Sequence, residues 1–169
     1  MRHAAFGVLC VWLFLSAGCW QSPLEHDEDA STEQYTEADI PNQTLQGKVG
    51  GRNWLFKSGK VCGDTAFNVE LYNFERSDPC NLEGSDFDYI FFEVPNEEGT
   101  YHLSFRDGNK QGVYFYDGDS FASMRNTDMA TEGILIIDSI TTSHVYLRIN
   151  ASAGEDDYAA GKCGVRICP

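Results

Sequence analysis

The chain has 169 residues and a formal net charge of −14 at pH 7, from 12 basic and 26 acidic residues. Hydrophobic residues make up 42% of it and aromatic residues 13%, which is enough for a packed core and excludes a wholly disordered protein. The length excludes a large multidomain enzyme, and the acidity excludes nucleic acid as the main partner because phosphate contacts require clustered Lys and Arg.

Residues 1–18 predict a secretory signal peptide. A basic start at Arg2 precedes an unbroken apolar run over residues 4–15, and small residues follow it. The run is shorter than the roughly 18–20 apolar residues of a membrane-spanning helix, so it is typical of a cleaved signal.

The end of this segment, Leu15-Ser-Ala-Gly-Cys19, resembles the lipobox of bacterial lipoproteins. The resemblance implies cleavage before Cys19 and a diacylglycerol group on its thiol, which would anchor the protein to a membrane. In Gram-negative lipoproteins the usual signal for retention in the inner membrane is Asp after the lipidated Cys, and Trp20 stands here instead. An outer-membrane lipoprotein facing the periplasm or the cell surface is therefore expected. The alternative is an ordinary cleaved signal peptide.

Residues 19–44 predict an acidic, disordered tether. The stretch from residue 21 to residue 44 has seven acidic residues, no Lys or Arg and few apolar side chains. Such a segment buries too little surface to offset its ordering entropy, and its like charges extend it. The alternative is an acidic tail that binds a partner.

Residues 45–169 predict an all-β domain. Apolar and polar residues alternate over 67–71, 101–105, 145–149 and 163–167, the period of a half-buried strand. Two continuous apolar runs, 89–92 and 134–137, predict strands that are buried on both faces or central in the sheet. Residues 45–54 resemble a hairpin that turns at Gly50-Gly51 and brings Trp54 into the core. Eight or nine short strands favour an antiparallel β-sandwich or a squat barrel.

Four cysteines remain in this domain when Cys10 of the signal and Cys19 are set aside. An even number behind a secretory signal predicts two disulfides. Three pairings are open, and we favour Cys62–Cys163 with Cys80–Cys168, because Cys163 and Cys168 face opposite sides of one strand. A zinc site is the alternative, although no Cys-x-x-Cys pair is present.

The domain resembles a loosely defined group of uncharacterised lipoproteins from Gram-negative bacteria. The shared features are Gly47-Lys-Val-Gly-Gly-Arg-Asn-Trp54, Pro79-Cys80, Val94-Pro-Asn-Glu-Glu-Gly-Thr-Tyr101 and Cys168-Pro169. The resemblance covers the whole domain, implies a β-sandwich and carries no known activity. The segment Ser85-Asp-Phe-Asp-Tyr-Ile-Phe-Phe-Glu-Val-Pro95 also resembles one hairpin of the bacterial pre-peptidase C-terminal domain.

No catalytic motif is found in the sequence, and we expect a protein that is not an enzyme. It contains no Gly-x-Ser-x-Gly, no His-Glu-x-x-His and no phosphate-binding glycine loop with Lys. The domain has two histidines, His102 and His144, and both have the outward parity of their strands. A hydrolase would be expected to lose activity when either is changed.

Acidic turns provide a candidate calcium site. Calcium prefers several oxygen ligands from flexible loops, and the candidate ligands are Asp86, Asp88, Asp117 and Asp119. The alternative is that Asp and Gly form the hairpin turns and keep the surface soluble.

Outward tyrosines provide a candidate ligand face. Tyr114 and Tyr116 flank the inward Phe115, and Tyr146 is also outward. Such rings stack on sugars or anchor protein interfaces, or they pair with each other across strands.

These features predict a noncatalytic recognition or structural module on the cell envelope, with a protein or glycan partner. The domain has eleven basic and nineteen acidic residues, a net charge of −8. Its charge and size are similar to those of periplasmic lysozyme inhibitors, so an acidic inhibitor of a basic secreted enzyme is one alternative. Calcium-dependent adhesion is the other.

Overall fold

Strands dominate the described part of the chain, which confirms an all-β fold. The computed structural model describes residues 35–81, 87–104, 111–118 and 127–169. Within these ranges no helix is long and apolar enough to cross a membrane. The elements are η1 (Glu37–Asp39), β1 (Gln46–Val49), β2 (Arg52–Leu55), β3 (Ser58–Cys62), β4 (Ala66–Tyr72), η2 (Pro79–Asn81), β5 (Tyr89–Pro95), β6 (Gly99–His102), β7 (Tyr114–Tyr116), β8 (Thr127–Met129), β9 (Glu132–Ile140), β10 (His144–Ser152) and β11 (Tyr158–Ile167).

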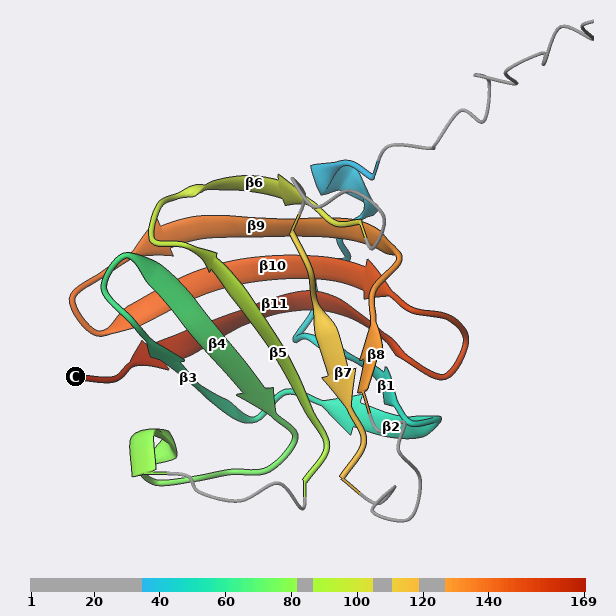
Figure 1. The fold of residues 1–169 in the computed structure, drawn as a ribbon, viewed down its shortest axis with the longest axis horizontal. Helices are drawn as coiled ribbons and strands as arrows, with labels where there is room; N and C mark the ends of the chain where they lie inside the picture. Colours follow the sequence, from blue (N-terminus) through green and yellow to red (C-terminus); the bar gives the residue numbers. More distant parts are fainter. Residues whose placement is uncertain (1–34, 82–86, 105–110, 119–126) are drawn as a thin grey trace, which may run out of the picture. The chain divides into compact units, whose positions relative to one another are not determined.

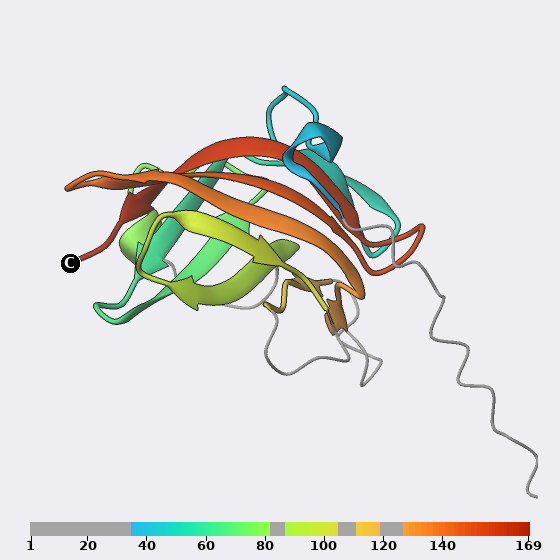
Figure 2. The same cartoon turned by 90° about the horizontal axis from the view of Figure 1, so that it is seen from above.

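The strands form one curled, open sheet where a sandwich or a squat barrel was expected. Its main path is β6-β9-β10-β11-β3-β4-β5-β7-β8, and the β1–β2 hairpin branches from β11. The junction of β11 with β3 is parallel and covers two residue pairs, whereas the other strand pairings are antiparallel. Two views show the half that contains β9, β10 and β11 lying across the half that contains β3, β4 and β5 (Figure 1, Figure 2).

The curl brings alternate residues of both halves into a common core. Val145, Leu147 and Ile149 of β10 are at most 1% exposed and belong to the same apolar cluster as Val69 and Leu71 of β4. Each such side chain contributes about 1.5–3 kcal/mol through burial. The period of two in the sequence therefore identified the inward face of these strands correctly.

The β1–β2 hairpin turns on two glycines, as expected. Gly50 and Gly51 have φ of +57° and +73°, the left-handed values that a two-residue hairpin turn requires at both central positions. The register then places Trp54 inward, where it is 2% exposed and its indole N–H donates to the carbonyl of Asp88 at 3.3 Å.

The run 134–137 is buried on both faces, as predicted. Leu135 and Ile137 enter the main core, while Ile134 and Ile136 lie on the outer face beneath Ile40. The covering residue comes from residues 35–44, which we call the strap.

The tether was expected to be disordered over residues 19–44, but the strap, residues 35–44, packs on the sheet. Arg148 of β10 forms ion pairs with Glu37 of the strap and with Asp138 of β9. The amide of Asn150 donates a hydrogen bond of 2.9 Å to a backbone carbonyl of η1. Ionic and apolar contacts together thus fix a segment whose composition predicted disorder.

One of the two favoured disulfides is present. Cys80 and Cys168 are bonded, with their Cα atoms 5.6 Å apart and a sequence separation of 88. The bond joins η2 to the residue that follows β11, next to the short parallel junction of β11 with β3.

The second favoured disulfide, Cys62–Cys163, is wrong, since both thiols are free. The parallel register pairs Lys60 with Arg166, so Cys62 lies level with residue 168. Cys163 is five positions away, about 16 Å along the strand. Cys163 also points into the core, whereas Cys62 shares the outward parity of Lys60. Burial raises the pKa of the Cys163 thiol.

Candidate functional site

The two histidines lie on different strands. His102 ends β6 and His144 begins β10. Nδ1 of His144 lies 2.9 Å from Oγ of Ser143, in an exposed turn where Thr141 Oγ1 accepts from the backbone N–H of His144 at 2.9 Å. Among the described residues no carboxylate hydrogen-bonds to the His144 ring, so an orienting acid for a Ser-His pair is not assembled there.

Two of the four candidate calcium ligands meet in space, with an arginine between them. Arg52 donates to the carboxylates of both Asp88 and Asp117. The backbone N–H of Gly118 also donates to Asp88, at 3.1 Å. The guanidinium is therefore already hydrogen-bonded to both carboxylates, and these hydrogen bonds raise the pKa of Arg52.

The other two candidates, Asp86 and Asp119, lie outside the described residues. Within the described ranges, no group of three or more His, Cys, Asp or Glu side chains is arranged to hold a metal ion.

Further acidic residues gather around the turn of the β1–β2 hairpin. Asp157 accepts the backbone N–H of Gly50 at 2.8 Å. Burial raises the pKa of Asp157, and the negative charges of Asp128, Asp156 and Asp117 raise it further, against the lowering effect of the Gly50 hydrogen bond. This end of the sheet thus concentrates negative charge.

The expected outward tyrosines of β7 belong to a row of aromatic rings. Tyr114 and Tyr116 point outward and Phe115 is 1% exposed, as the alternation predicted. Tyr116 lies 4.7 Å from the ring of Tyr89, and Tyr114 stacks on Phe91 at 4.9 Å with an angle of 14° between the rings. They thus pair across strands, which was the structural alternative to a ligand face.

The row continues on β4, which lies beside β5 (Figure 1), and in the segments next to these strands. Tyr72 lies 6.1 Å from Tyr89 and 5.3 Å from Phe74, which in turn lies 4.6 Å from Phe87. The guanidinium of Arg76 lies 5.6 Å from the centre of the Phe74 ring. We call this row the aromatic ladder; its members are Tyr72, Phe74, Phe87, Tyr89, Phe91, Tyr114 and Tyr116.

The phenols at the centre of the ladder are held in the neutral form. Burial raises the pKa of Tyr72, and a hydrogen bond that Tyr72 donates to the Glu70 carboxylate raises it further. Burial, followed by the charge of Glu70, also raises the pKa of Tyr89. Lys60 lies 3.3 Å from the Glu70 carboxylate and balances its charge.

Sequence reasoning missed most of the ladder, because the run 89–92 was expected to be buried on both faces or central in the sheet. Ile90 and Phe92 do enter the core, but Tyr89 and Phe91 remain partly exposed on the outer face. Their alternation with Ile90 and Phe92 was the available signal. It was hidden because the residues on both faces are apolar.

The third candidate tyrosine, Tyr146, lies away from the ladder on β10. Its side chain is 47% exposed and lies over Gly164 of β11. It lines a hollow of about 450 Å³ together with Phe56 and Lys162. The three tyrosines therefore do not form one face.

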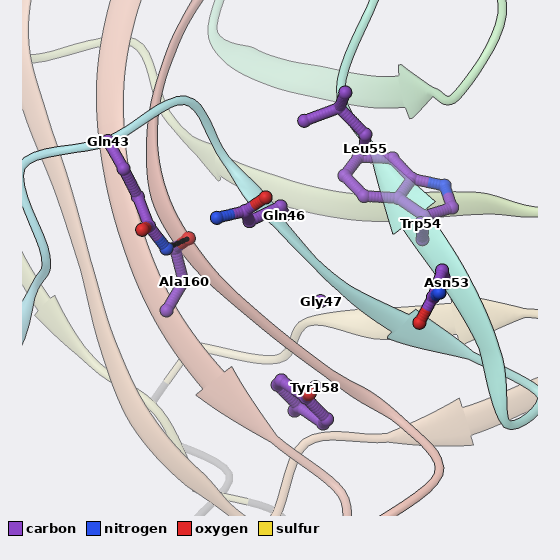
Figure 3. Close-up of a pocket in the computed structure, with 8 residues that line it drawn as sticks. All are labelled: Gln43, Gln46, Gly47, Asn53, Trp54, Leu55, Tyr158 and Ala160. Atoms are coloured by element: carbon purple, nitrogen blue, oxygen red, sulfur yellow. Dashed lines mark hydrogen bonds between the residues drawn. The ribbon is translucent and has the colours of Figure 1, made fainter.

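A second hollow, of about 490 Å³, lies on the outer face of β2, β1 and β11 (Figure 3). Sequence reasoning did not identify it, although Asn53 and Leu55 alternate with the buried Trp54 in β2. We call this hollow the amide dish; its walls are Gln43, Gln46, Gly47, Asn53, Trp54, Leu55, Tyr158 and Ala160.

No protein-family model, curated protein or solved structure matches the chain. The function proposed below is therefore based on the chain's own residues.

Proposed function

We propose that this chain is an envelope lipoprotein, anchored through Cys19, that acts as a noncatalytic recognition module for a protein partner. The curled sheet would serve as a two-layer scaffold, as a β-sandwich does, and the aromatic ladder would be its contact surface. The lipobox at Leu15-Ser-Ala-Gly-Cys19 supports the anchor.

The observation that carries the recognition role is the aromatic ladder itself. It has seven rings, and only Tyr72 among them is almost fully buried, at 2% exposure. The other six are partly exposed, and clustered aromatic rings at a surface are typical of protein interfaces, where Tyr and Trp contribute much of the binding energy.

The tilt of the rings favours a protein partner over a stacked sugar. Neighbouring rings in the ladder are inclined by 31° to 51°, and only Phe91 and Tyr114 are nearly parallel. Such rings form ridges and grooves into which side chains of a partner can pack, whereas a flat platform would need coplanar rings.

Site-specific photo-crosslinking in intact cells tests this role. A photoreactive phenylalanine analogue is placed at position 116, and at position 146 in the matched control, since Tyr146 is exposed on the other half of the sheet. We expect one discrete protein adduct from position 116 and none from position 146. Equal adduct patterns from the two positions would reject the ladder as the contact surface.

Replacement of Cys19 tests the anchor separately. Cys19→Ser leaves the domain unchanged but removes the thiol that would carry the lipid. We expect the wild-type chain in the membrane fraction, with a mass increase at its N-terminus after cleavage, and the variant in the soluble fraction. Membrane association of the variant would contradict lipidation at this residue.

The acidic residues near the β1–β2 turn support a second candidate function, binding of a basic secreted enzyme. Burial raises the pKa of Asp157, and the negative charges of Asp128, Asp156 and Asp117 raise it further. Such binding would weaken steeply with salt, because surface ion pairs are screened over about 10 Å at 0.1 M. Binding through the ladder would change little with salt.

A further inference from the structure

The amide dish is built from side chains without formal charge. None of its eight lining residues is Asp, Glu, Lys, Arg or His, although 22% of the chain is charged. The register places Gln46 between Leu55 and Ala160, and places Asn53 and Tyr158 on either side of Lys48, the next residue of β1 on this face. The eight lining side chains are therefore neutral, and one cation, Lys48, lies between Asn53 and Tyr158 on the same face.

Three carboxamides line the dish, with Gln46 between Gln43 on one side and Asn53 on the other (Figure 3). Gln43 donates its Nε2 to the carbonyl of Ala160 at 3.4 Å, which leaves its amide oxygen free to accept. The side chains of Gln46 and Asn53 make no hydrogen bond to another described residue. Each amide offers both a donor and an acceptor, as a hydroxyl group of a ligand also does.

Apolar groups complete the walls. Tyr158 is 39% exposed and Leu55 is 43% exposed, on the two strands that flank β1. The dish has about 490 Å³, within the usual size range of small-ligand sites. An exposed aromatic ring presents a surface on which the C–H face of a ring-shaped ligand can pack.

We propose that the amide dish binds an uncharged carbohydrate residue. The amides would pair with its hydroxyl groups, and the ring of Tyr158 would cover its C–H face. An anionic ligand would instead need Lys48, which stands beside the lining residues and is not one of them. An extended peptide added to the open edge of β2 would use backbone groups, whereas the dish consists of side chains on the face of the sheet. The proposal is independent of the aromatic ladder.

Saturation-transfer NMR on the full chain tests this site. The probes are five neutral oligosaccharides, namely maltotriose, cellotriose, mannotriose, galactotriose and the trimer of N-acetylglucosamine. We expect transfer to at least one of them, a fall in affinity of tenfold or more for Asn53→Ala and for Tyr158→Ala, and a smaller fall for Tyr158→Phe, which keeps the ring. Asn68→Ala is the matched control, because Asn68 is an exposed amide of β4 outside the dish. Circular dichroism verifies the fold of each variant.

Several results would overturn the proposal. They are the absence of transfer from all five sugars, binding that Asn53→Ala and Tyr158→Ala leave unchanged, or a preference for an acidic oligosaccharide that Lys48→Ala abolishes. Competition by an uncharged peptide stronger than that by any of the sugars would point to a peptide site instead. Tyr116→Ala, which alters the ladder, should leave sugar binding intact, so the two proposals can fail separately.

Discussion

Loss of the Cys80–Cys168 disulfide should remove a large part of the stability of this domain. The bond lies beside the junction of β11 with β3, where only Arg166 with Lys60 and Ile167 with Val61 are paired. All other links along the main path of the sheet involve at least three residue pairs. The disulfide therefore reinforces the shortest pairing between the two halves of the curled sheet.

The size of the effect follows from the length of chain that the bond closes. For a separation of 88 residues, the loop-closure entropy of the unfolded chain corresponds to about 4.5 kcal/mol at 25 °C. Domains of this size have total unfolding free energies of about 5–15 kcal/mol. The double variant Cys80→Ser with Cys168→Ser should therefore unfold at a much lower denaturant concentration.

Urea unfolding, followed by tryptophan fluorescence, measures the difference between wild type and the double variant. Cys62→Ser is the control, because this free thiol is half-buried on the outer face and its loss should cost no more than about 0.5 kcal/mol. A loss below about 1 kcal/mol in the double variant, or an equal loss in Cys62→Ser, would refute the reasoning.

Three further predictions concern the strap, the hairpin turn and the acidic residues. Ile40→Ala should lower the unfolding free energy by about 2 kcal/mol in urea titrations, because the side chain covers Ile134 and Ile136; an unchanged midpoint would show that the strap adds no stability. Gly50→Ala should cost at least about 1 kcal/mol by the same assay, since φ is +57° there, and a neutral result would contradict the turn. Asp157→Asn should raise the urea midpoint above that of wild type at pH 7, and the two midpoints should become equal below pH 3.8. The sign follows because an acid whose pKa is raised on folding destabilises the folded chain when ionised, and the penalty disappears as the pH falls through that raised pKa. If the urea midpoint of Asp157→Asn were still above that of wild type at pH 3, ionisation of Asp157 would not be the reason for the gain.

The amino-acid pattern predicted the strands because inward residues must be apolar wherever one face of a strand is buried. The alternation at Val145, Leu147 and Ile149 therefore identified the core face of β10, and the glycine pair at 50–51 identified the hairpin turn. Of the two options that the pattern left open for the segment 89–92, a central strand is right and burial on both faces is wrong, because aromatic residues lie on both of its faces and no polar residue marks the outer one. The pattern failed for the strap, whose acidic residues predicted disorder.

The sequence by itself determined which residues of the alternating strands face inward and where the β1–β2 hairpin turns. These are local properties, set by the period of two and by the φ values that glycine permits. Tertiary structure alone decided that Cys80 pairs with Cys168 while Cys62 and Cys163 stay apart, because the register of β11 against β3 fixes those distances. It alone also placed Arg52 between Asp88 and Asp117 and closed the amide dish, since each of these arrangements joins strands that are distant in the chain.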